Sequence, residues 1–225
     1  MAVKGTTFTF FGEGGTSAND RLMDNLMFSC CCAQVDSSWT PVCGCYSGPN
    51  TCSSGCLAER LVAPDMYLVI AQDVYEVVRK SFPAASIWFT GHSLGGSLAS
   101  LLAATNNLAA FAYEAPGELL YAQRIGLKID PSNMQRYPIF HFGNDADPIY
   151  LGTCQGRFST CYQFHYAMET GCHIGSTCTY DGGAVTNINN HRLNVCINRF
   201  YTPAPVVPTC IPQNDCVDCG AWKFE

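Results

Sequence analysis

Gly91, Ser93 and Gly95 form the pattern G-x-S-x-G within the segment SIWFTGHSLGGSLASLLA. This pattern is typical of a sharp, strained turn between a strand and a helix, where the serine hydroxyl is exposed at the edge of a sheet. An apolar run (86–90) precedes the pattern, and a run of leucine and small residues follows it, so the sequence predicts both flanking elements. The alternative is a packing turn in which Ser93 only caps the helix. The flanking elements and the additional Gly96 favour a nucleophilic serine.

A serine hydroxyl becomes a nucleophile when a base contacts it and a third group orients that base. For this pattern the order along the chain is serine, then aspartate or glutamate, then histidine. Asp145 and Asp147 both follow the predicted strand YPIFHF (137–142), so either would lie at the sheet edge that carries the serine. We prefer Asp147 as the acid because the following Pro148 restricts its backbone. Asp145 is interpreted as a hydrated turn residue.

Five histidines are candidates for the base, and we favour His191. It lies in the polar loop TNINNH just before the apolar run LNVCI, where a base carried by a loop is expected. His92 is adjacent to the serine within the turn and therefore points away from the hydroxyl. His141 lies in a predicted strand and is interpreted as a core histidine. His165 and His173 lie in a cysteine-rich stretch, which favours surface or structural roles.

Acyl transfer through a serine also needs two hydrogen-bond donors for the oxyanion that forms in the transition state. One is the backbone N–H of Leu94, the residue after the nucleophile. The other comes from a loop that follows an earlier strand. The segment Lys4-Gly5-Thr6 is the candidate upstream of the serine, and we expect Thr6 to contribute there.

Strands and helices alternate along the part of the chain that carries these residues. The predicted strands are 86–90, 108–114 and 137–142, and residues 3–11 resemble the end of a strand that runs into a turn. Predicted helical segments separate the later strands. This alternation indicates an α/β fold with a mostly parallel sheet.

A further helix is predicted from Pro64 to Ser81, with one apolar stripe at three- and four-residue intervals. Its members are Met66, Ile70, Val74, Val77 and Val78. Before it, residues 12–60 are interpreted as an irregular insertion with one helix around residues 19–29. The proline-rich tail (203–225) is expected to be extended. We interpret the whole chain (1–225) as a single domain.

Fifteen cysteines occur in the chain, and seven of them lie between Cys30 and Cys56. This density is expected where disulfides persist, outside the reducing cytosol. An odd number leaves at least one thiol unpaired. Zinc is the alternative, but the cluster lacks the paired spacings typical of zinc ligands, so we expect disulfides and no metal. Cys216 and Cys219 form a CxxC pair, which we interpret as structural.

The formal net charge is −6, and the 12 lysines and arginines are scattered, which argues against nucleic acid as a partner. The sequence has no run of about 18 apolar residues, and its first residues do not resemble a signal peptide. The cysteine content nevertheless indicates an oxidising compartment. We therefore expect the chain to be a fragment whose targeting segment lies upstream of Met1.

Nine segments together resemble the vacuolar autophagic-body lipases of fungi, a branch of the class 3 (fungal-type) lipases. They are AVKGTT, FSCCCAQVDSSW, VCGCYSG, IWFTGHSLGGSLASLL, YEAPGE, DADPIYLGTC, YAMETGCH, NHR and DCVDC. The resemblance covers nearly the whole chain. It implies an α/β-hydrolase fold in which Ser93, Asp147 and His191 act as nucleophile, acid and base, and in which Thr6 and Leu94 bind the oxyanion.

The resemblance also implies hydrolysis of phospholipids and acylglycerols at a membrane surface, in the breakdown of autophagic bodies in the vacuole lumen, with no cofactor. Members of this family resemble type II membrane proteins, so the anchor and the first strands of the sheet are expected to be absent from this chain. Secretion is the alternative location.

Residues 12–60 are then interpreted as a lid or a lipid-contacting surface, although for each single residue considered we favour core packing. The apolar residues considered for this surface are Phe8, Phe10, Phe11, Leu22, Met23, Leu26, Met27 and Phe28. Two other functions remain open: a non-catalytic relic of a hydrolase that binds lipid or a partner, and an esterase for non-lipid esters.

Overall fold

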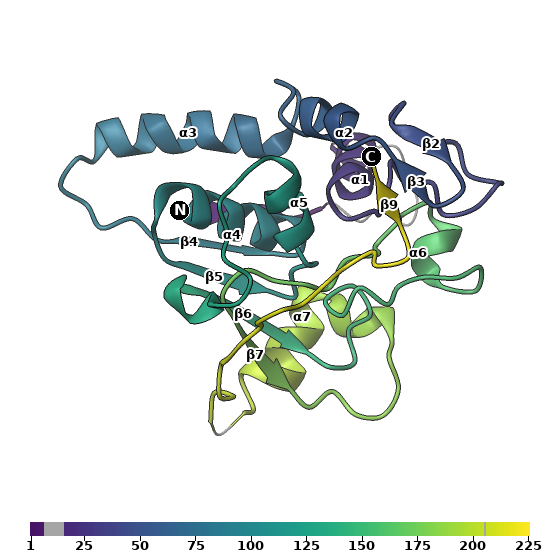
Figure 1. Ribbon diagram of the computed structural model, residues 1–225. Coiled ribbons are helices and arrows are strands. Elements are labelled where there is room, and N and C mark those ends of the chain that lie inside the picture. Colours follow the sequence, from purple (N-terminus) through teal and green to yellow (C-terminus); the bar gives the residue numbers. More distant parts are fainter. Residues whose placement is uncertain (7–15, 205) are drawn as a thin grey trace.

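The computed structural model describes residues 1–6, 16–204 and 206–225. Its larger sheet has the strand order β1-β4-β5-β6-β7-β8 (Figure 1). Neighbouring strands run parallel except β7 and β8, which are antiparallel. The bounds are Ala2–Val3 (β1), Phe89–His92 (β4), Ala110–Tyr113 (β5), Ile139–Asn144 (β6), Ser176–Tyr180 (β7) and Ile211–Pro212 (β8). The predicted α/β architecture with a mostly parallel sheet is confirmed.

Helix α4 (Leu94–Asn106) covers one face of this sheet, and α3 (Tyr67–Ser81) lies outside α4 (Figure 1). Small residues bring α4 close to the strands, since a Cβ on Gly96 would lie 3.4 Å from the Ala112 side chain of β5. Residues 94–103 of α4 are all buried. This close packing fixes the start of α4 relative to the ends of β4 and β5.

The predicted helix at 64–81 is present but begins at Tyr67, and the stripe chosen from the sequence is only partly correct. Met66 and Val78 pack in or against the core, whereas the other three members are exposed. Ile70, Val74 and Val77 are 46%, 48% and 64% exposed. Leu68 and Tyr75 are buried instead. The reason is packing on neighbouring elements, because the Tyr75 ring lies 5.3 Å from the Phe89 ring of β4.

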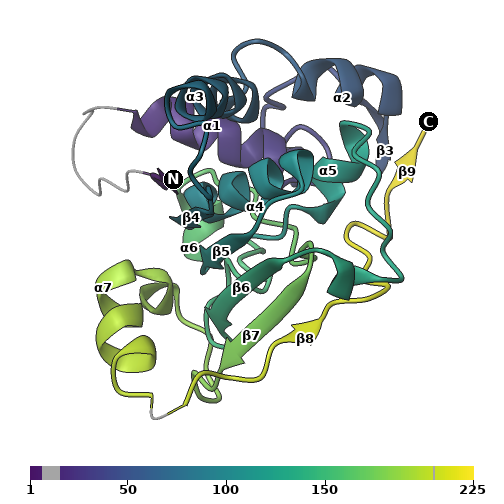
Figure 2. The same cartoon turned by 90° about the vertical axis from the view of Figure 1, so that its left-hand side faces the viewer.

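Aromatic side chains line the opposite face of the sheet. The Phe111 ring of β5 stacks on Phe140 of β6 with a centroid distance of 5.7 Å. At the end of β5, the Tyr113 ring lies 5.5 Å from Tyr201. Tyr201 ends a π-helix (Ile197–Tyr201) that follows α7 (Leu193–Cys196), and Figure 2 shows α7 on the other side of the strands from α4.

The strand before the serine begins later than predicted. Residues 86–90 were expected, but β4 spans Phe89–His92 and runs directly into the turn. Its register with its neighbours explains the shift, because Phe89 pairs with Ala110 of β5 and Thr90 pairs with Ala2 of β1. The sequence analysis did not predict β7 or β8.

The cysteine-rich segment before α3 is more regular than expected. It contains α1, two short strands and α2, and the second of these strands pairs with a strand at the C-terminus. The bounds are Ser17–Met27 (α1), Tyr46–Gly48 (β2), Thr51–Cys52 (β3), Ser54–Leu61 (α2) and Lys223–Phe224 (β9). The remaining short helices are α5 (Leu119–Arg124), α6 (Thr160–Gln163) and 3₁₀ turns at Met134–Arg136 and Ile188–His191.

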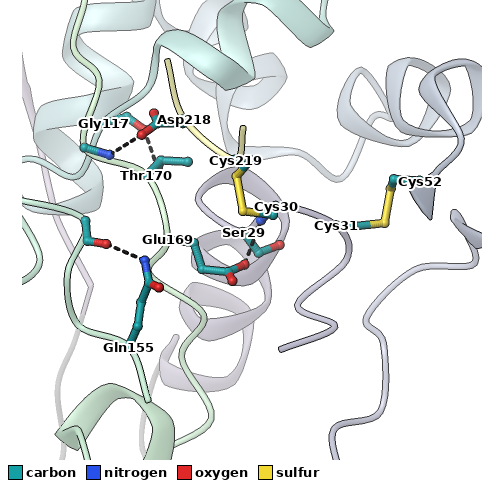
Figure 3. The surroundings of a disulfide bond; sticks show 12 residues. Ser29, Cys30, Cys31, Cys52, Gly117, Gln155, Glu169, Thr170, Asp218 and Cys219 are labelled. Carbon is teal, nitrogen blue, oxygen red and sulfur yellow. Dashed lines mark hydrogen bonds between the residues drawn. A yellow bond between two sulfur atoms is a disulfide. The ribbon is translucent and has the colours of Figure 1, made fainter. Parts of the chain in front are cut away.

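Seven disulfides connect the cysteines, so the disulfide interpretation is confirmed over zinc. The pairs are Cys30–Cys219, Cys31–Cys52, Cys32–Cys43, Cys45–Cys56, Cys154–Cys161, Cys172–Cys216 and Cys178–Cys210. Figure 3 shows Cys30 joined to Cys219, with Glu169 accepting a hydrogen bond from the Cys30 backbone at 2.7 Å. The members of the C-terminal CxxC pair thus bond to distant partners. Cys196 is free and buried.

None of the described helices combines the length and the apolar character that crossing a bilayer requires.

Candidate active site

Ser93 occupies the turn between β4 and α4 in a strained backbone conformation, with φ 57° and ψ −134°. The turn is possible only because its neighbours are glycines. A Cβ on Gly91 would lie 2.2 Å from the Gly95 carbonyl oxygen, and a Cβ on Gly95 would lie 2.3 Å from the Val3 carbonyl oxygen. Strain of this kind persists where the surrounding structure enforces it, typically at functional sites. The turn places the serine hydroxyl at the carboxyl edge of the sheet.

The structure brings Ser93, His191 and Asp147 into one hydrogen-bonded chain. The Ser93 hydroxyl donates to His191 Nε2 at 2.8 Å, and His191 Nδ1 donates to Asp147 Oδ2 at 2.7 Å. The direction of the second bond follows from the carboxylate, which can only accept. Ser93 and His191 are each 8% exposed, and Asp147 is fully buried. This is the arrangement in which an imidazole removes a proton from a serine while a carboxylate orients the imidazole.

Asp147 lies three residues beyond the end of β6, in a tight turn that closes on itself. Its Oδ1 accepts a hydrogen bond from the Ile149 backbone at 2.9 Å, and its own N–H donates to the Asn144 carbonyl at 3.1 Å. Asp145 is exposed and accepts from the Gly182 backbone instead. The sequence preference for Asp147 over Asp145 therefore agrees with the geometry.

His191 ends a 3₁₀ turn that is capped at its start by the Asn187 side chain, which accepts a hydrogen bond from the Asn189 backbone. A second histidine supports it from behind, because His92 Nε2 lies 2.8 Å from the His191 carbonyl oxygen and donates to it. The two rings lie 5.0 Å apart. The sequence analysis placed His92 correctly away from the serine hydroxyl but missed this contact. Only its position next to the nucleophile could have suggested it.

Thr6 lines the same site as Ser93. Its hydroxyl donates to Asp24 Oδ2 at 2.9 Å, which ties this residue to α1. The preceding Gly5 packs against the serine turn, since a Cβ there would lie 2.3 Å from the His92 carbonyl oxygen. Leu94 is the first residue of α4, and the first N–H groups of a helix have no acceptor within the helix. Both predicted oxyanion residues are therefore next to Ser93, and Asp24 is a supporting residue that the sequence did not reveal.

Burial determines the charge of the two histidines at the site. It lowers the pKa of His191 to about 4, with the negative field of Glu114 acting in the opposite direction. Burial also lowers the pKa of His92 to about 4. Burial raises the pKa of Asp147, while hydrogen bonds from Glu114 and the Ile149 backbone lower it. A neutral His191 is the form that can accept a proton.

A cavity of about 280 Å³ opens beside the serine. It is lined by Thr6, His92, Ser93, Ile149, Ile188, Asn189, His191, Arg192 and Leu193. Three of these side chains are aliphatic, and they surround the point where an acyl group would meet the serine hydroxyl. Arg192 supplies a positive charge at the same cavity.

Core packing, favoured for each of the residues considered for a lid, is confirmed for four of them. Met23, Leu26, Met27 and Phe28 are 0–2% exposed and belong to the core. The reason is that α1 turns its apolar side inward beneath the disulfide-linked segments. Leu22 is half-buried against the same core. Phe8, Phe10 and Phe11 lie outside the described residues.

Two groups of side chains have metal-ligand chemistry among the described residues. The first, Cys32, Cys43 and Cys45, has its sulfur atoms in disulfides. A sulfur in a disulfide is not a thiolate, and the thiolate is the form that binds a metal. This first group therefore offers no metal ligands.

The second group is Glu118, His141 and His173, whose ligand atoms lie within 4.8 Å of one another. His141 is fully buried in β6, 3.2 Å from the Glu118 carboxylate, which agrees with a core position. The ring nitrogens of His173 face two oxygen atoms of the protein, Ala115 O at 2.9 Å and Gln213 Oε1 at 3.2 Å. His173 thus has a structural role, and we assign no metal to the group.

Comparisons with known proteins agree with this geometry. The profile of the family described as lipase (class 3) matches residues 28–111, which include the serine turn. Fungal proteins named "Putative lipase ATG15" match the whole chain. That of Vanderwaltozyma polyspora is 46% identical over 233 residues, which cover 100% of this chain and 41% of the relative. That of Saccharomyces cerevisiae is 44% identical over 234 residues, covering 100% of this chain and 45% of the relative.

The relative from Yarrowia lipolytica is 42% identical over 231 residues, covering 100% of this chain and 42% of the relative. The chain thus spans less than half the length of each of these relatives. The similarity extends over all the elements that carry Ser93, Asp147 and His191. Residues 28–111 thus match the class 3 lipase family, and the whole chain is similar to part of each of these relatives. The mostly parallel sheet with a serine turn between β4 and α4 is an α/β-hydrolase fold.

Proposed function

We propose that this chain is a serine carboxylic-ester hydrolase that acts on lipids. The observation that carries the proposal is the continuous chain of hydrogen bonds from Asp147 through His191 to Ser93, at a strained turn beside a partly apolar cavity. The names of the relatives as lipases support the same reaction. No cofactor takes part in it.

The reaction follows from the roles of the three side chains. Ser93 Oγ attacks the ester carbonyl carbon while His191 Nε2 takes the hydroxyl proton. The carbonyl oxygen becomes an oxyanion, which the backbone N–H groups of Leu94 and Thr6 stabilise, since the Thr6 hydroxyl donates to Asp24. His191 then gives the proton to the leaving alcohol as the C–O bond breaks. Water repeats these steps on the acyl-enzyme, so that the fatty acid leaves and Ser93 is regenerated.

Phospholipid, triacylglycerol or both are the proposed substrates. The aliphatic side chains of Ile149, Ile188 and Leu193 in the cavity suit an acyl chain. Arg192 suits a substrate with a phosphate group near the ester, because guanidinium binds phosphate in a bidentate manner. From the resemblance to the autophagic-body lipases of fungi, we further propose that the chain acts on membranes of autophagic bodies in the vacuole lumen. The seven disulfides fit a lumenal or secreted protein.

The activity is tested by labelling with a fluorophosphonate probe on disulfide-bonded protein. We expect labelling of Ser93 in the wild type and none in Ser93→Ala, with strongly reduced labelling in His191→Ala. Equal unfolding curves for the three proteins serve as the control for folding. A folded wild type that is not labelled would contradict the proposal and leave a non-catalytic relic that binds lipid or a partner.

The substrate class is tested with a series of matched esters: phosphatidylserine and phosphatidylcholine vesicles, triacylglycerol emulsions and a short soluble ester. We expect lipid esters to be hydrolysed faster than the soluble ester. Arg192→Gln is expected to reduce phospholipid hydrolysis more than triacylglycerol hydrolysis. If the soluble ester is the best substrate, the chain is an esterase for non-lipid esters.

A further inference from the structure

A second carboxyl group, that of Glu114, lies behind the candidate triad. Glu114 follows β5 directly, has a positive φ of 44° and is fully buried. It accepts hydrogen bonds from the Asn144 backbone at 3.1 Å, from Asn144 Nδ2 at 2.9 Å and from the Tyr201 hydroxyl at 2.8 Å. Because its carboxyl group accepts three hydrogen bonds, the Glu114 side chain is held in one position.

Asn144 joins Glu114 to the turn that carries Asp147, because its backbone N–H and side chain donate to the Glu114 carboxyl group while its carbonyl oxygen accepts from the Asp147 N–H at 3.1 Å. The two carboxyl groups therefore lie close enough for each to shift the pKa of the other. The two Asp147 oxygens already accept from His191 Nδ1 and from the Ile149 backbone. Two bare carboxylates in buried contact repel each other strongly, and such a pair holds one proton between its members. Since Asp147 faces an imidazole N–H, the proton belongs on the Glu114 side of the pair.

We propose that Glu114 is a positioning residue that, in its protonated form, donates a hydrogen bond to Asp147 and holds that carboxylate against His191. The inference rests on the proposed function, because Asp147 matters only if His191 acts as a base. It adds a fourth side chain to the site, and this side chain acts through Asp147 without touching the substrate.

The titratable groups that face Glu114 come from several elements. They are Asp147, His191, Tyr150, Tyr180, Cys196 and Tyr201. Burial raises the pKa of Glu114 to about 8, and the charge of Asp147 adds to this rise. The pair therefore holds its last proton more tightly than an isolated carboxyl group does and loses it at a higher pH.

Loss of this proton has a direct consequence for the triad. The O–H donor to Asp147 disappears, and two buried negative charges then repel each other across the former hydrogen bond. This repulsion moves the Asp147 carboxylate away from its best position on His191. The structure thus predicts an alkaline limit to activity near the pH at which the carboxyl pair loses its last proton.

Glu114→Gln tests the inference because glutamine has the same shape and keeps an N–H donor at every pH. We expect the alkaline limb of the pH profile of kcat/KM, measured on a soluble short-chain ester, to move upward by roughly one pH unit or more. Glu114→Ala removes the proposed donor to Asp147 and the acceptor of the three hydrogen bonds from Asn144 and Tyr201. It should reduce kcat/KM at the optimum by at least about tenfold, because buried donors are left unpaired.

The matched control is Glu118→Gln, a buried carboxyl group four residues away that bonds to Ser100 and the Ile174 backbone, away from the triad. It should leave the alkaline limb in place. Infrared difference spectra provide a second readout that does not depend on activity. In the wild-type minus Glu114→Gln difference spectrum at neutral pH we expect a protonated carboxylic acid C=O band, since other buried acids such as Asp24 contribute equally to both proteins and cancel.

The outcomes separate this inference from the proposed function. If the wild type neither reacts with the probe nor hydrolyses esters, the function fails, while the infrared band still tests the carboxyl pair. If the wild type is active but Glu114→Gln has the same alkaline limb, or if the difference spectrum of the two proteins contains no acid band, the positioning role of Glu114 is wrong.

Discussion

The molecule holds its candidate site and its outer segments together by different means. Residues 57–153 contain no cysteine, although they include β4, α4, β5 and β6 and carry both Ser93 and Asp147. Here the constraints are strand pairing, close helix packing and hydrogen bonds of buried side chains. All seven disulfides join cysteines outside this range, in the segment 30–56 and in residues 154–219.

The difference follows from the length of the regular elements in each region. Strands β2, β3, β8 and β9 have two or three residues each, and strands this short cannot hold themselves in place by pairing alone. The disulfides supply the missing constraint, and the Cys30–Cys219 bond connects residues 189 positions apart. The comparison teaches that crosslinks stabilise the shell, meaning residues 30–56 and 154–219, whereas Ser93 and Asp147 are positioned by packing and hydrogen bonds. His191 lies in the loop that the Cys178–Cys210 bond closes, and its hydrogen bonds to Ser93 and Asp147 connect the two regions.

The largest effect is expected from a change within the cysteine-free region. Ser93→Ala should reduce ester hydrolysis by roughly 10⁶-fold, because removal of a nucleophile in a triad removes nearly all of its contribution. The free energy of unfolding should change little, since a serine and an alanine at this turn share the same backbone. Residual hydrolysis within tenfold of the wild type would show that another group is the nucleophile.

Asp147→Asn tests the orientation of His191 with almost no change in shape. We expect kcat/KM to fall by about 10⁴-fold, because an amide in place of the carboxylate favours the wrong imidazole tautomer. The measurement is hydrolysis of a soluble ester at the optimum pH of the wild type. Asp145→Asn is the matched control, since Asp145 is exposed, and it should retain wild-type kinetics.

Much of the cysteine-free region could be predicted from the sequence. The serine turn, the strands at 108–114 and 137–142 and the choice of Asp147 depend on local patterns and on the order of residues along the chain. The errors there concern packing. Ile70, Val74 and Val77 share one helical face, but which face a neighbour covers is decided by the tertiary structure, where Tyr75 meets Phe89.

The shell could not be predicted in the same way. Spacing indicated disulfides but not their connectivity, because Cys216 and Cys219 are close in sequence yet bond to Cys172 and Cys30. Strand β7 was missed because its sequence, STCTY, is short and mostly polar and so lacks the apolar pattern of a buried strand. Its strand conformation depends on pairing with β6. The hydrogen bond between Thr6 and Asp24 could not be predicted either, because no sequence pattern indicates that these two segments meet.

The long disulfide provides the third test. The double variant Cys30→Ser and Cys219→Ser should lose about 2–5 kcal/mol of unfolding free energy, because it opens a large loop in the unfolded chain. Cys154→Ser with Cys161→Ser, whose residues are separated by 7 positions, should lose less. Denaturant unfolding measures both. Under native conditions the folded fraction should still react with the fluorophosphonate probe at the wild-type rate, and a slower reaction would show that crosslinks also shape the site.

The smallest effect concerns Asp24, the residue of α1 that connects the cysteine-rich region to the site through Thr6. Burial raises the pKa of Asp24 to about 8, and the Thr6 hydroxyl only partly opposes this rise. A carboxyl group with a raised pKa in the folded state stabilises the fold in acid and loses that contribution as pH rises toward the folded pKa. Glu114 acts in the same direction, whereas His92, His173 and His191, with lowered pKa values, favour the fold above their unfolded pKa and oppose it as pH falls.

Above the unfolded pKa of histidine the carboxyl groups dominate, so stability should fall as the solution becomes more alkaline. Asp24→Asn removes one of these groups with little change in shape. The slope of unfolding free energy against pH should therefore become less negative by roughly 1 kcal/mol per pH unit around neutral pH. Unfolding curves of the two proteins at several pH values provide the measurement. Equal slopes of unfolding free energy against pH for the two proteins would mean that Asp24 is ionised in the folded protein. The Thr6 hydroxyl would then donate to a carboxylate of α1 instead of a neutral carboxylic acid.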